Sequence, residues 1–485
     1  MKRLRLLALL ALVLSPLLHP TGARADLASD IDPVLEDKLL RKGHVAIEVV
    51  RLGEKAGQDE PVYSHNAEMP LIPASNLKLV TTAAALEKLG DRFNFKTELR
   101  TTAEGDLVLV GDGDPVLGDA EYLKKAAWKS TTLFEKWAVQ LRETHNLRSV
   151  RDVIVDDSVF DPNEMLHPHW PADQVQKRYV PEVAGLNFNA NCVDFQIHAP
   201  VPGQLVQYSM DPPTRYVTVR NSCVAGKENA IWLSREATSN DIILKGESRG
   251  TREPVSVTVH DPSLYTATVF SETLAANGVR REGSVRRDNT FRSRNAGTVV
   301  AVHETPLPTV LARANKDSMN LYAESLCKRL GRETSGESGT WANGTRAVAD
   351  FLRRVGVPDE QFHLDDGCGL SKENMISPRA LVKVLAHEFH GKNKDAYLVS
   401  LSIAGIDGTL DDRFKGSDLR GRVIGKSGYV NGVRTLSGFV RTKDGPHYAF
   451  SILMNRIPDD PTVKLLQEKI VKAVDAHASA LATRE

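Results

Sequence analysis

Hydrophobic positions near both ends of the chain alternate with polar ones, as they do in β-strands. Residues 44–51 alternate in this way, and residues 61–65 follow them after a polar loop, so the pattern predicts a hairpin. Near the C-terminus, residues 422–430, 434–441 and 447–454 form three more runs, separated by Asn-Gly and Lys-Asp-Gly turns. We therefore predict one five-stranded antiparallel sheet built from both chain ends.

Helical spacing of apolar residues marks the segments beside these strands. One helix is expected to start at Ser75, which can cap it after Pro73, and to stop at Gly90. Further helices are predicted at residues 308–314, 318–330, 344–355 and 462–476. A sheet with helices of this kind predicts an α+β fold.

The middle of the chain has a different texture, with short alternating runs divided by turn residues. These runs are residues 107–110, 152–155, 193–198, 216–220, 241–244 and 255–260. Residues 95 to about 291 therefore predict a mostly β insertion that forms one or more separate lobes.

Charge and composition exclude some classes of protein. The 485 residues include 62 basic and 62 acidic side chains, and a formal net charge of +0 argues against a nucleic-acid-binding protein. With 41% hydrophobic and 26% charged residues, the chain has the composition of a folded globular protein.

The first 25 residues have the pattern of a secretory signal peptide. Lys2, Arg3 and Arg5 precede a mostly apolar run at residues 6–18, and Ala23-Arg24-Ala25 resembles a cleavage site. The alternative is an uncleaved membrane anchor. We predict cleavage before Asp26 and a secreted, periplasmic protein with at most peripheral membrane contact.

Four cysteines, Cys192, Cys223, Cys327 and Cys368, would then lie in an oxidising compartment. An even number of cysteines there predicts disulfides, and four residues allow three pairings. We favour Cys192 with Cys223 and Cys327 with Cys368. The absence of a C-x-x-C spacing argues against a zinc or redox motif.

The first candidate for chemistry is Ser75-Asn76-Leu77-Lys78. A helix places its hydroxyl and amine on one face, and a partly desolvated lysine can take the proton of a serine nucleophile. The pattern is weak alone, because Ser325 and Lys328 have the same spacing and are better explained as a helix face.

The second candidate is Ser318-Met319-Asn320, which would present a hydroxyl and a carboxamide from the start of a helix. A simple helix cap is the alternative for Ser318. The same S-x-N spacing at residues 64–66 precedes the nucleophile, and the one at 293–295 has no apolar helix behind it to hold it rigid.

The third candidate is Lys426-Ser427-Gly428 on the first strand of the C-terminal meander. A cation and a hydroxyl on a strand edge suit an anionic carboxylate, and glycine lets a substrate backbone approach. As an isolated tripeptide, it would more often be an exposed strand lysine.

Together, these three motifs resemble the S-x-x-K, S-x-N and K-T/S-G set of the penicillin-recognising serine acyltransferases. The long separation of Ser75 from Ser318 resembles the low-molecular-mass class C penicillin-binding proteins, the D-alanyl-D-alanine carboxypeptidase/endopeptidases of the penicillin-binding protein 4 type. Further blocks that resemble the family occur in its order at residues 73–75, 111–115, 186–189, 366–371 and 404–410.

Three residues depart from the family pattern. Met319 replaces the usual aspartate and is expected to point away from the site; Ser427 replaces threonine and keeps the hydroxyl. Cys368 stands where serine is usual, as a disulfide partner or as a free thiol near the cleft.

The resemblance implies a domain organisation around a β-lactamase/transpeptidase-like catalytic domain. Residues 26–94 and 292–485 would form that domain, residues 95–190 and 251–291 a second domain, and residues 191–250 a third, β-rich domain nested in it.

The resemblance also implies a serine DD-peptidase that acts on peptidoglycan stem peptides without a metal or cofactor. Ser75 would attack the carbonyl between two D-alanines, with Lys78 as proton acceptor and the N–H groups of Ser75 and Tyr429 as oxyanion hole. The remaining roles fall to Ser318 with Lys426 as proton relay, Asn320 on the peptide carbonyl, and Lys426 with Ser427 and Gly428 at the terminal carboxylate. β-Lactams would acylate Ser75.

Other interpretations stay open at this point. A β-lactamase shares the motifs, and a non-catalytic peptidoglycan-binding scaffold shares the fold. Gly246-Glu247-Ser248-Arg249-Gly250 matches a nucleophile elbow but leads into another strand, and residues 385–390 miss the H-E-x-x-H spacing. His167-Pro168-His169 could bind a metal, but no carboxylate partner is evident, so we predict a surface loop.

Overall fold

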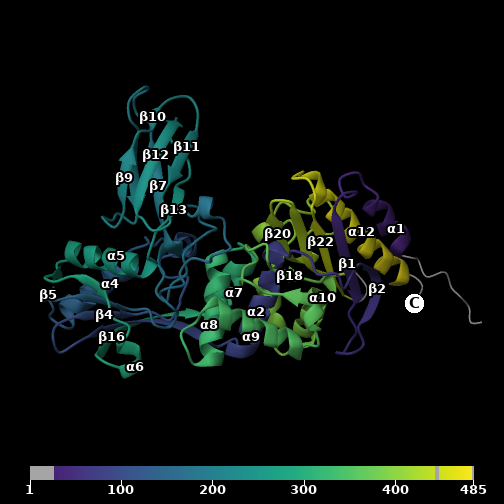
Figure 1. The fold of residues 1–485 in the computed structure, drawn as a ribbon, viewed down its shortest axis with the longest axis horizontal. Coiled ribbons are helices and arrows are strands. Elements are labelled where there is room, and N and C mark those ends of the chain that lie inside the picture. Colours follow the sequence, from purple (N-terminus) through teal and green to yellow (C-terminus); the bar gives the residue numbers. More distant parts are fainter. Residues whose placement is uncertain (1–26, 443–446, 483–485) are drawn as a thin grey trace, which may run out of the picture.

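The computed structural model describes residues 27–442 and 447–482, so the predicted signal peptide and the 443–445 turn lie outside the described residues. Both chain ends contribute to one antiparallel sheet, shown in the right half of Figure 1. Its strands, in spatial order, are β19 (Ser402–Ile403), β20 (Val423–Val430), β21 (Val433–Val440), β22 (Tyr448–Asn455), β1 (His44–Arg51) and β2 (Glu60–His65). The five predicted strands are therefore present, with the two-residue β19 as a sixth.

Helices cover both faces of this sheet, because its strands carry apolar side chains on both sides. On one face, α1 (Leu27–Leu35) and α12 (Thr462–Ala482) pack in a core with Ile47, Val49 and Ile452. The other face, which includes Ala46 and Leu453, contacts a second core. That core is built mainly by α2 (Leu77–Leu89), α7 (Leu307–Asn315), α8 (Asn320–Ser335), α9 (Trp341–Arg354), α10 (Pro378–His390) and α11 (Lys394–Ser400).

A second, mixed sheet lies at the other end of the long axis (Figure 1). Its order is β15 (Val285–Arg287), β6 (Val153–Asp156), β4 (Leu107–Val110), β3 (Asn94–Thr101) and β16 (Thr298–Pro306). Two short helices, α3 (Ala120–Leu123) and α6 (Phe291–Arg294), and the two-stranded pair β5 (Ser149–Val150) and β14 (Arg280–Arg281) accompany it. Because β16 pairs with β3, the second sheet extends past residue 291, and the domain limits given above remain a prediction.

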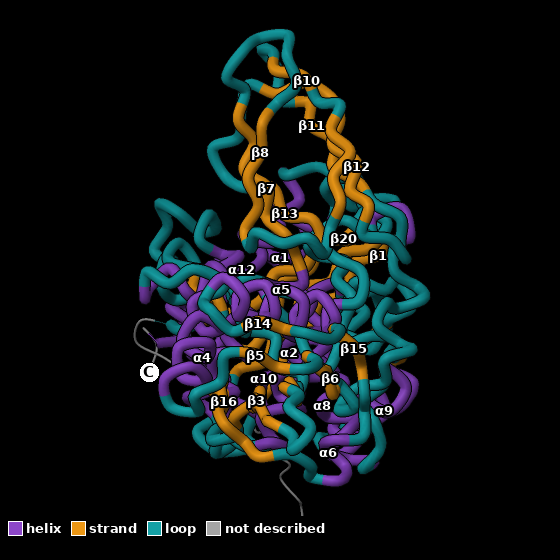
Figure 2. The backbone as a smooth tube through the Cα atoms, turned by 90° about the vertical axis from the view of Figure 1, so that its left-hand side faces the viewer, coloured by secondary structure: helices purple, strands orange, loops and turns teal. Residues whose placement is uncertain are grey.

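A narrow lobe of strands projects from the rest of the molecule in Figure 2. It holds a sheet of β13 (Val255–Thr258), β7 (Cys192–His198) and β8 (Gln207–Asp211). A second sheet joins β9 (Thr218–Asn221), β10 (Val224–Ala225), β11 (Ala230–Ser234) and β12 (Asp241–Ser248). Ser248 ends β12 and the next element is strand β13, so the strand, turn and helix of a nucleophile elbow are absent at this point of the structure.

The prediction of a mostly β insertion missed two long helices, α4 (Thr132–Glu143) and α5 (Pro262–Ala276). Their aromatic side chains Phe134, Trp137 and Phe270 form one cluster, in which the rings of Phe134 and Phe270 lie 5.2 Å apart between centroids. Within the described residues, no helix combines the length and hydropathy that a membrane span needs.

The four cysteines are buried free thiols, so neither predicted disulfide is present in the structure. Cys192 Sγ lies 3.3 Å from the carbonyl oxygen of Ala190, and Cys368 Sγ lies 3.8 Å from Asp366 Oδ2. An even number of cysteines does not determine whether any two thiols lie close enough to pair, and here the thiols serve as small core side chains.

We expect the denatured protein, prepared without reductant, to react with four equivalents of a thiol reagent. Burial raises the pKa of the Cys327 and Cys368 thiols well above its usual range, so the folded protein should react slowly. Absorbance during thiol titration measures both quantities. A count of two or none after denaturation would contradict the free-thiol structure.

Candidate active site

The nucleophile candidate Ser75 lies on a 3₁₀ turn, η1 (Ala74–Asn76), that leads directly into α2. Ala74 has a φ of 46°, which an L-residue adopts only under constraint, and such strain is common at active sites. The N-cap of α2 is Asn76, with no side-chain cap bond, so the prediction that Ser75 caps the helix is wrong. The Ser75 hydroxyl instead lies 3.0 Å from Lys78 Nζ.

Lys78 is fully buried, and its amine has three oxygen partners. Nζ lies 3.0 Å from Ser75 Oγ, 2.7 Å from Asn320 Oδ1 and 2.8 Å from the carbonyl oxygen of Cys368. Burial lowers the pKa of Lys78, although the acidic groups of Cys368, Asp366 and Glu324 oppose this shift. An amine held against a serine hydroxyl with a lowered pKa is suited to accept its proton.

A second lysine and serine pair stands beside the first. Lys426 Nζ on β20 donates to Ser318 Oγ at 2.9 Å and to the carbonyl oxygen of Ser427 at 2.8 Å. Burial, followed by the charge of Lys78, lowers the pKa of Lys426 well below its usual range, while Asp317 opposes the shift. Two neighbouring buried amines resist carrying two charges, which favours a neutral amine in the site.

Ser318 is not a helix cap. It has a φ of 56°, and the N-cap of α8 is the following residue, Met319. Met319 packs against the hydrophobic core and does not line the cavity, as expected for a residue that points away from the site. The strained backbone at Ser318 therefore places its hydroxyl on Lys426.

Asn320 connects the catalytic residues to the insertion. Its Oδ1 accepts from Lys78 Nζ, and its Nδ2 donates to the carbonyl oxygen of Tyr179 at 2.7 Å. The chain between β6 and β7, which contains Tyr179, therefore forms part of the wall around the site.

Strand β20 runs close to the nucleophile turn because Gly428 has no side chain. A Cβ at this position would lie 3.0 Å from Ser75 N and 2.2 Å from Thr435 Oγ1. Thr435 Oγ1 also donates to the carbonyl oxygen of Pro73 at 2.8 Å, which ties η1 to the sheet. Tyr429, the next residue on the strand, is 49% exposed at the mouth of the site.

These elements surround a cavity of about 610 Å³. Its lining residues are Ser75, Pro171, Gln174, Tyr179, Ser318, Asn320, Gly369, Leu370, Lys372, Tyr429, Val430 and Asn431. Four predicted site residues line it directly, while Lys78 and Lys426 lie buried behind their serines. Ser427 and Gly428 are on the adjoining strand and do not line the cavity.

The three sequence motifs missed the loop after β17 (Phe362–His363), which supplies a backbone carbonyl to Lys78. Asp366 Oδ1 accepts from the N–H groups of Cys368 at 3.1 Å and Gly369 at 2.6 Å. This turn directs the Cys368 carbonyl at Lys78. Position 369 requires glycine, because its φ is 83° and a Cβ there would lie 1.8 Å from Ala74 O. The 366–371 block was the available sequence signal.

Comparisons with known proteins place this geometry in context. A sequence model of the D-Ala-D-Ala carboxypeptidase 3 (S13) family matches residues 27–477. The chain is 31% identical over 460 residues to a D-alanyl-D-alanine carboxypeptidase of Actinomadura sp. (strain R39). The aligned region covers 90% of this chain and 82% of that protein. A D-alanyl-D-alanine carboxypeptidase of Haemophilus influenzae is 25% identical over 422 residues, covering 83% of this chain and 84% of that protein.

The fold is also shared with a solved structure. Penicillin binding protein 4 of Haemophilus influenzae superposes with a TM-score of 0.76 at 22% identity, covering 94% of this chain and 99% of that chain. This likeness confirms the predicted α+β architecture of a transpeptidase-like domain with large insertions.

Proposed function

Because the chain belongs to the D-Ala-D-Ala carboxypeptidase 3 (S13) family, it is a serine D-Ala-D-Ala carboxypeptidase, and we propose that Ser75 is its nucleophile. The observation that carries this proposal is the contact of Ser75 Oγ with Lys78 Nζ at 3.0 Å, on the wall of the cavity. A non-catalytic scaffold would not need a buried amine beside an accessible hydroxyl.

In the acylation step, Ser75 Oγ bonds to the carbonyl carbon of the penultimate D-alanine and gives its proton to neutral Lys78. We assign the oxyanion hole to the backbone N–H groups of Ser75 and Tyr429. Gly428, the residue before Tyr429, lets β20 approach Ser75 N, because a Cβ at 428 would lie 3.0 Å from that atom. Collapse of the tetrahedral intermediate breaks the C–N bond. Lys426, through Ser318, protonates the departing amine.

The remaining groups bind the substrate. Asn320 is positioned to hold the peptide carbonyl, while Lys426 and the Ser427 hydroxyl attract the terminal carboxylate. Water then attacks the ester carbonyl and gives one proton through Ser318 to Lys426. The Ser75 Oγ–C bond breaks, and Lys78 returns its proton to Ser75. A β-lactam carbonyl follows the same first step, but its leaving amine stays attached to the acyl group, so the adduct is long-lived.

We further propose that the same site cleaves D-alanyl cross-links. The scissile bond joins the same D-alanyl carbonyl to an amine on a second D-centre, so the chemistry at Ser75 is unchanged. The cavity is also bounded by insertion residues Pro171, Gln174 and Tyr179, which offer contacts to a second stem peptide.

The reaction implies a place outside the cytoplasm, where peptidoglycan is built. We propose export to the periplasm directed by residues 1–25, with a basic start and an apolar run. The processed chain would start at Asp26, one residue before the first described helix.

The test is incubation of the processed protein with a peptide that ends in D-Ala-D-Ala, with β-lactam hydrolysis measured in parallel. We expect stoichiometric release of D-alanine and slow β-lactam turnover, and a matched peptide ending in L-Ala-L-Ala should release nothing. Rapid β-lactam hydrolysis without D-alanine release would indicate a β-lactamase, and inactivity in both assays would indicate a scaffold. Cross-linked muropeptides, separated by chromatography, test the endopeptidase proposal.

A further inference from the structure

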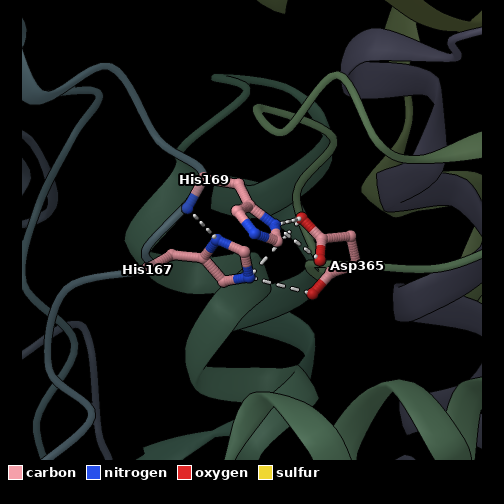
Figure 3. Close-up of side chains that lie close together, drawn as sticks. All are labelled: His167, His169 and Asp365. Atoms are coloured by element: carbon pink, nitrogen blue, oxygen red, sulfur yellow. Dashed lines mark hydrogen bonds and ion pairs between the residues drawn. The ribbon is translucent and has the colours of Figure 1, made fainter.

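The His167-Pro168-His169 sequence lies in the insertion, and the fold places a carboxylate against it from 196 residues away. Figure 3 shows both imidazole rings turned toward Asp365, which belongs to the loop after β17. This partner could not be predicted from the sequence, because Asp365 reaches the two histidines only through packing of the insertion on the catalytic part.

The three side chains form a compact set of metal-binding atoms. His169 Nδ1 lies 3.0 Å from Asp365 Oδ1 and 2.9 Å from Oδ2, and His167 Nε2 lies 3.7 Å from Oδ2. One ligand atom from each residue lies within 4.8 Å of the others. Donor atoms about 2.0–2.2 Å from a tetrahedral ion are separated by roughly 3.3–3.6 Å, so small rotations bring this set onto one ion.

We propose that His167, His169 and Asp365 bind one zinc-type divalent cation. Two imidazoles and one carboxylate are ligands that Zn²⁺ accepts, and they leave a fourth position for water. The His167 side chain is 3% exposed and fixes one side of the site, whereas the His169 side chain is 55% exposed and gives the ion a path from solvent.

Binding requires one local rearrangement. In the structure, His167 Nδ1 accepts from the N–H of His169 at 3.2 Å, and Nε2–H donates to the carbonyl oxygen of Asp365 at 3.0 Å. Coordination through Nε2 moves the imidazole proton to Nδ1, so these two hydrogen bonds are exchanged for a metal bond. The Asp365 carboxylate already accepts a hydrogen bond from Ser371 Oγ, and an outer contact of this kind orients a metal ligand.

The ion would join two walls of the active-site cavity. Pro171 and Tyr179 follow the two histidines, and Gly369 and Leu370 follow Asp365. Between them, Trp170 Nε1 donates to Asp366 Oδ2 at 2.9 Å. The site therefore fixes the insertion against the turn that supports Lys78, and its role is structural rather than in the chemistry at Ser75.

The proposal is tested by titrating zinc into the processed protein after treatment with a chelator. Calorimetry measures the binding, and the visible spectrum of the protein loaded with Co²⁺ in place of zinc reports the geometry. We expect one equivalent to bind, a tetrahedral Co²⁺ spectrum and a higher melting temperature with zinc. His169→Ala, at a largely exposed side chain, should fold normally. It should weaken zinc binding by more than about 100-fold, because loss of a residue that only hydrogen-bonds a ligand already costs about 10- to 100-fold.

His363→Ala is the matched control, because this exposed histidine lies two residues from Asp365 and outside the cluster. It should bind zinc like the unmodified protein, and Asp365→Asn should lose binding like His169→Ala. No saturable zinc binding in the unmodified protein, or equal binding after His169→Ala, would overturn the proposal.

Discussion

Ser75→Ala should release D-alanine about 10⁴-fold more slowly than the unmodified enzyme, or not measurably, because the acyl-enzyme cannot form without the Oγ nucleophile. The variant should remain folded, since Lys78 is the one hydrogen-bond partner of the hydroxyl among the described residues, and Thr435 Oγ1 holds the turn through the carbonyl of Pro73. D-alanine release under saturating peptide measures the loss.

Ser325→Ala is the control for this substitution. Ser325 begins the other S-x-x-K sequence, is fully buried, and its Oγ has no hydrogen-bond partner among the described residues. It should therefore keep nearly full activity. Intact-protein mass spectrometry after benzylpenicillin gives a second readout: an adduct on Ser75→Ala would show that the nucleophile is another residue.

The strands of the main sheet were predictable because a single pattern, an alternating or apolar run between turn residues, marks each of them. β1 and the C-terminal meander alternate or run apolar between Asn-Gly and similar turns, and the observed bounds of β1, β20 and β21 lie within about two residues of expectation. The short β19 was not predictable, because two residues carry no periodicity.

Helix α5 was missed for the opposite reason. Ten of its residues are buried, on several faces, so it has no polar stripe that would indicate an amphipathic helix. Its β-branched and aromatic residues, among them Thr266, Val269 and Phe270, favour strands by composition. Burial by the surrounding sheet and lobe overrides that local preference.

Some groups of the site were also predictable from the sequence, and others are selected only by the packing of the fold. Ser75, Lys78, Ser318, Asn320 and Lys426 were identifiable because their residue types and order carry the chemistry. The structure brings them together as two hydrogen-bonded groups: Lys78 contacts Ser75 and Asn320, and Lys426 contacts Ser318. The carbonyl groups of Cys368 and Tyr179 could not be identified, because every residue has a carbonyl and only the fold selects which one contacts the site.

Replacing Lys78 with methionine should lower the acylation rate by about 10²- to 10⁴-fold, the usual contribution of a general base. In the unmodified enzyme the rate should rise with pH and level off above the lowered pKa of Lys78, because only the neutral amine accepts the Ser75 proton. Stopped-flow measurement of labelling by a fluorescent penicillin across pH gives both results. If the rising limb persists in Lys78→Met, the base is another group, with Lys426 the first alternative.

Lys78→Met should lower the activity of the protein without lowering its stability. Lys78 is buried beside neutral acceptors, so the folded state binds fewer protons than the unfolded chain between the lowered pKa and the ordinary 10.5, and Lys78 contributes stability that increases with pH across that window. Lys78→Met removes this pH dependence and the desolvation of the amine. Urea unfolding at several pH values should therefore show a variant at least as stable as the unmodified protein at low pH.

Lys328→Met separates the catalytic role from the general effect of losing a buried amine. Burial lowers the pKa of Lys328 to about 8, and its side chain packs over Trp341, away from the residues that line the cavity. Both methionine variants remove a desolvated lysine, but only Lys78→Met removes one in contact with Ser75. Equal losses of acylation in the two variants would contradict the assignment of Lys78 as base, whereas loss in Lys78→Met alone ties the rate to the 3.0 Å contact with Ser75.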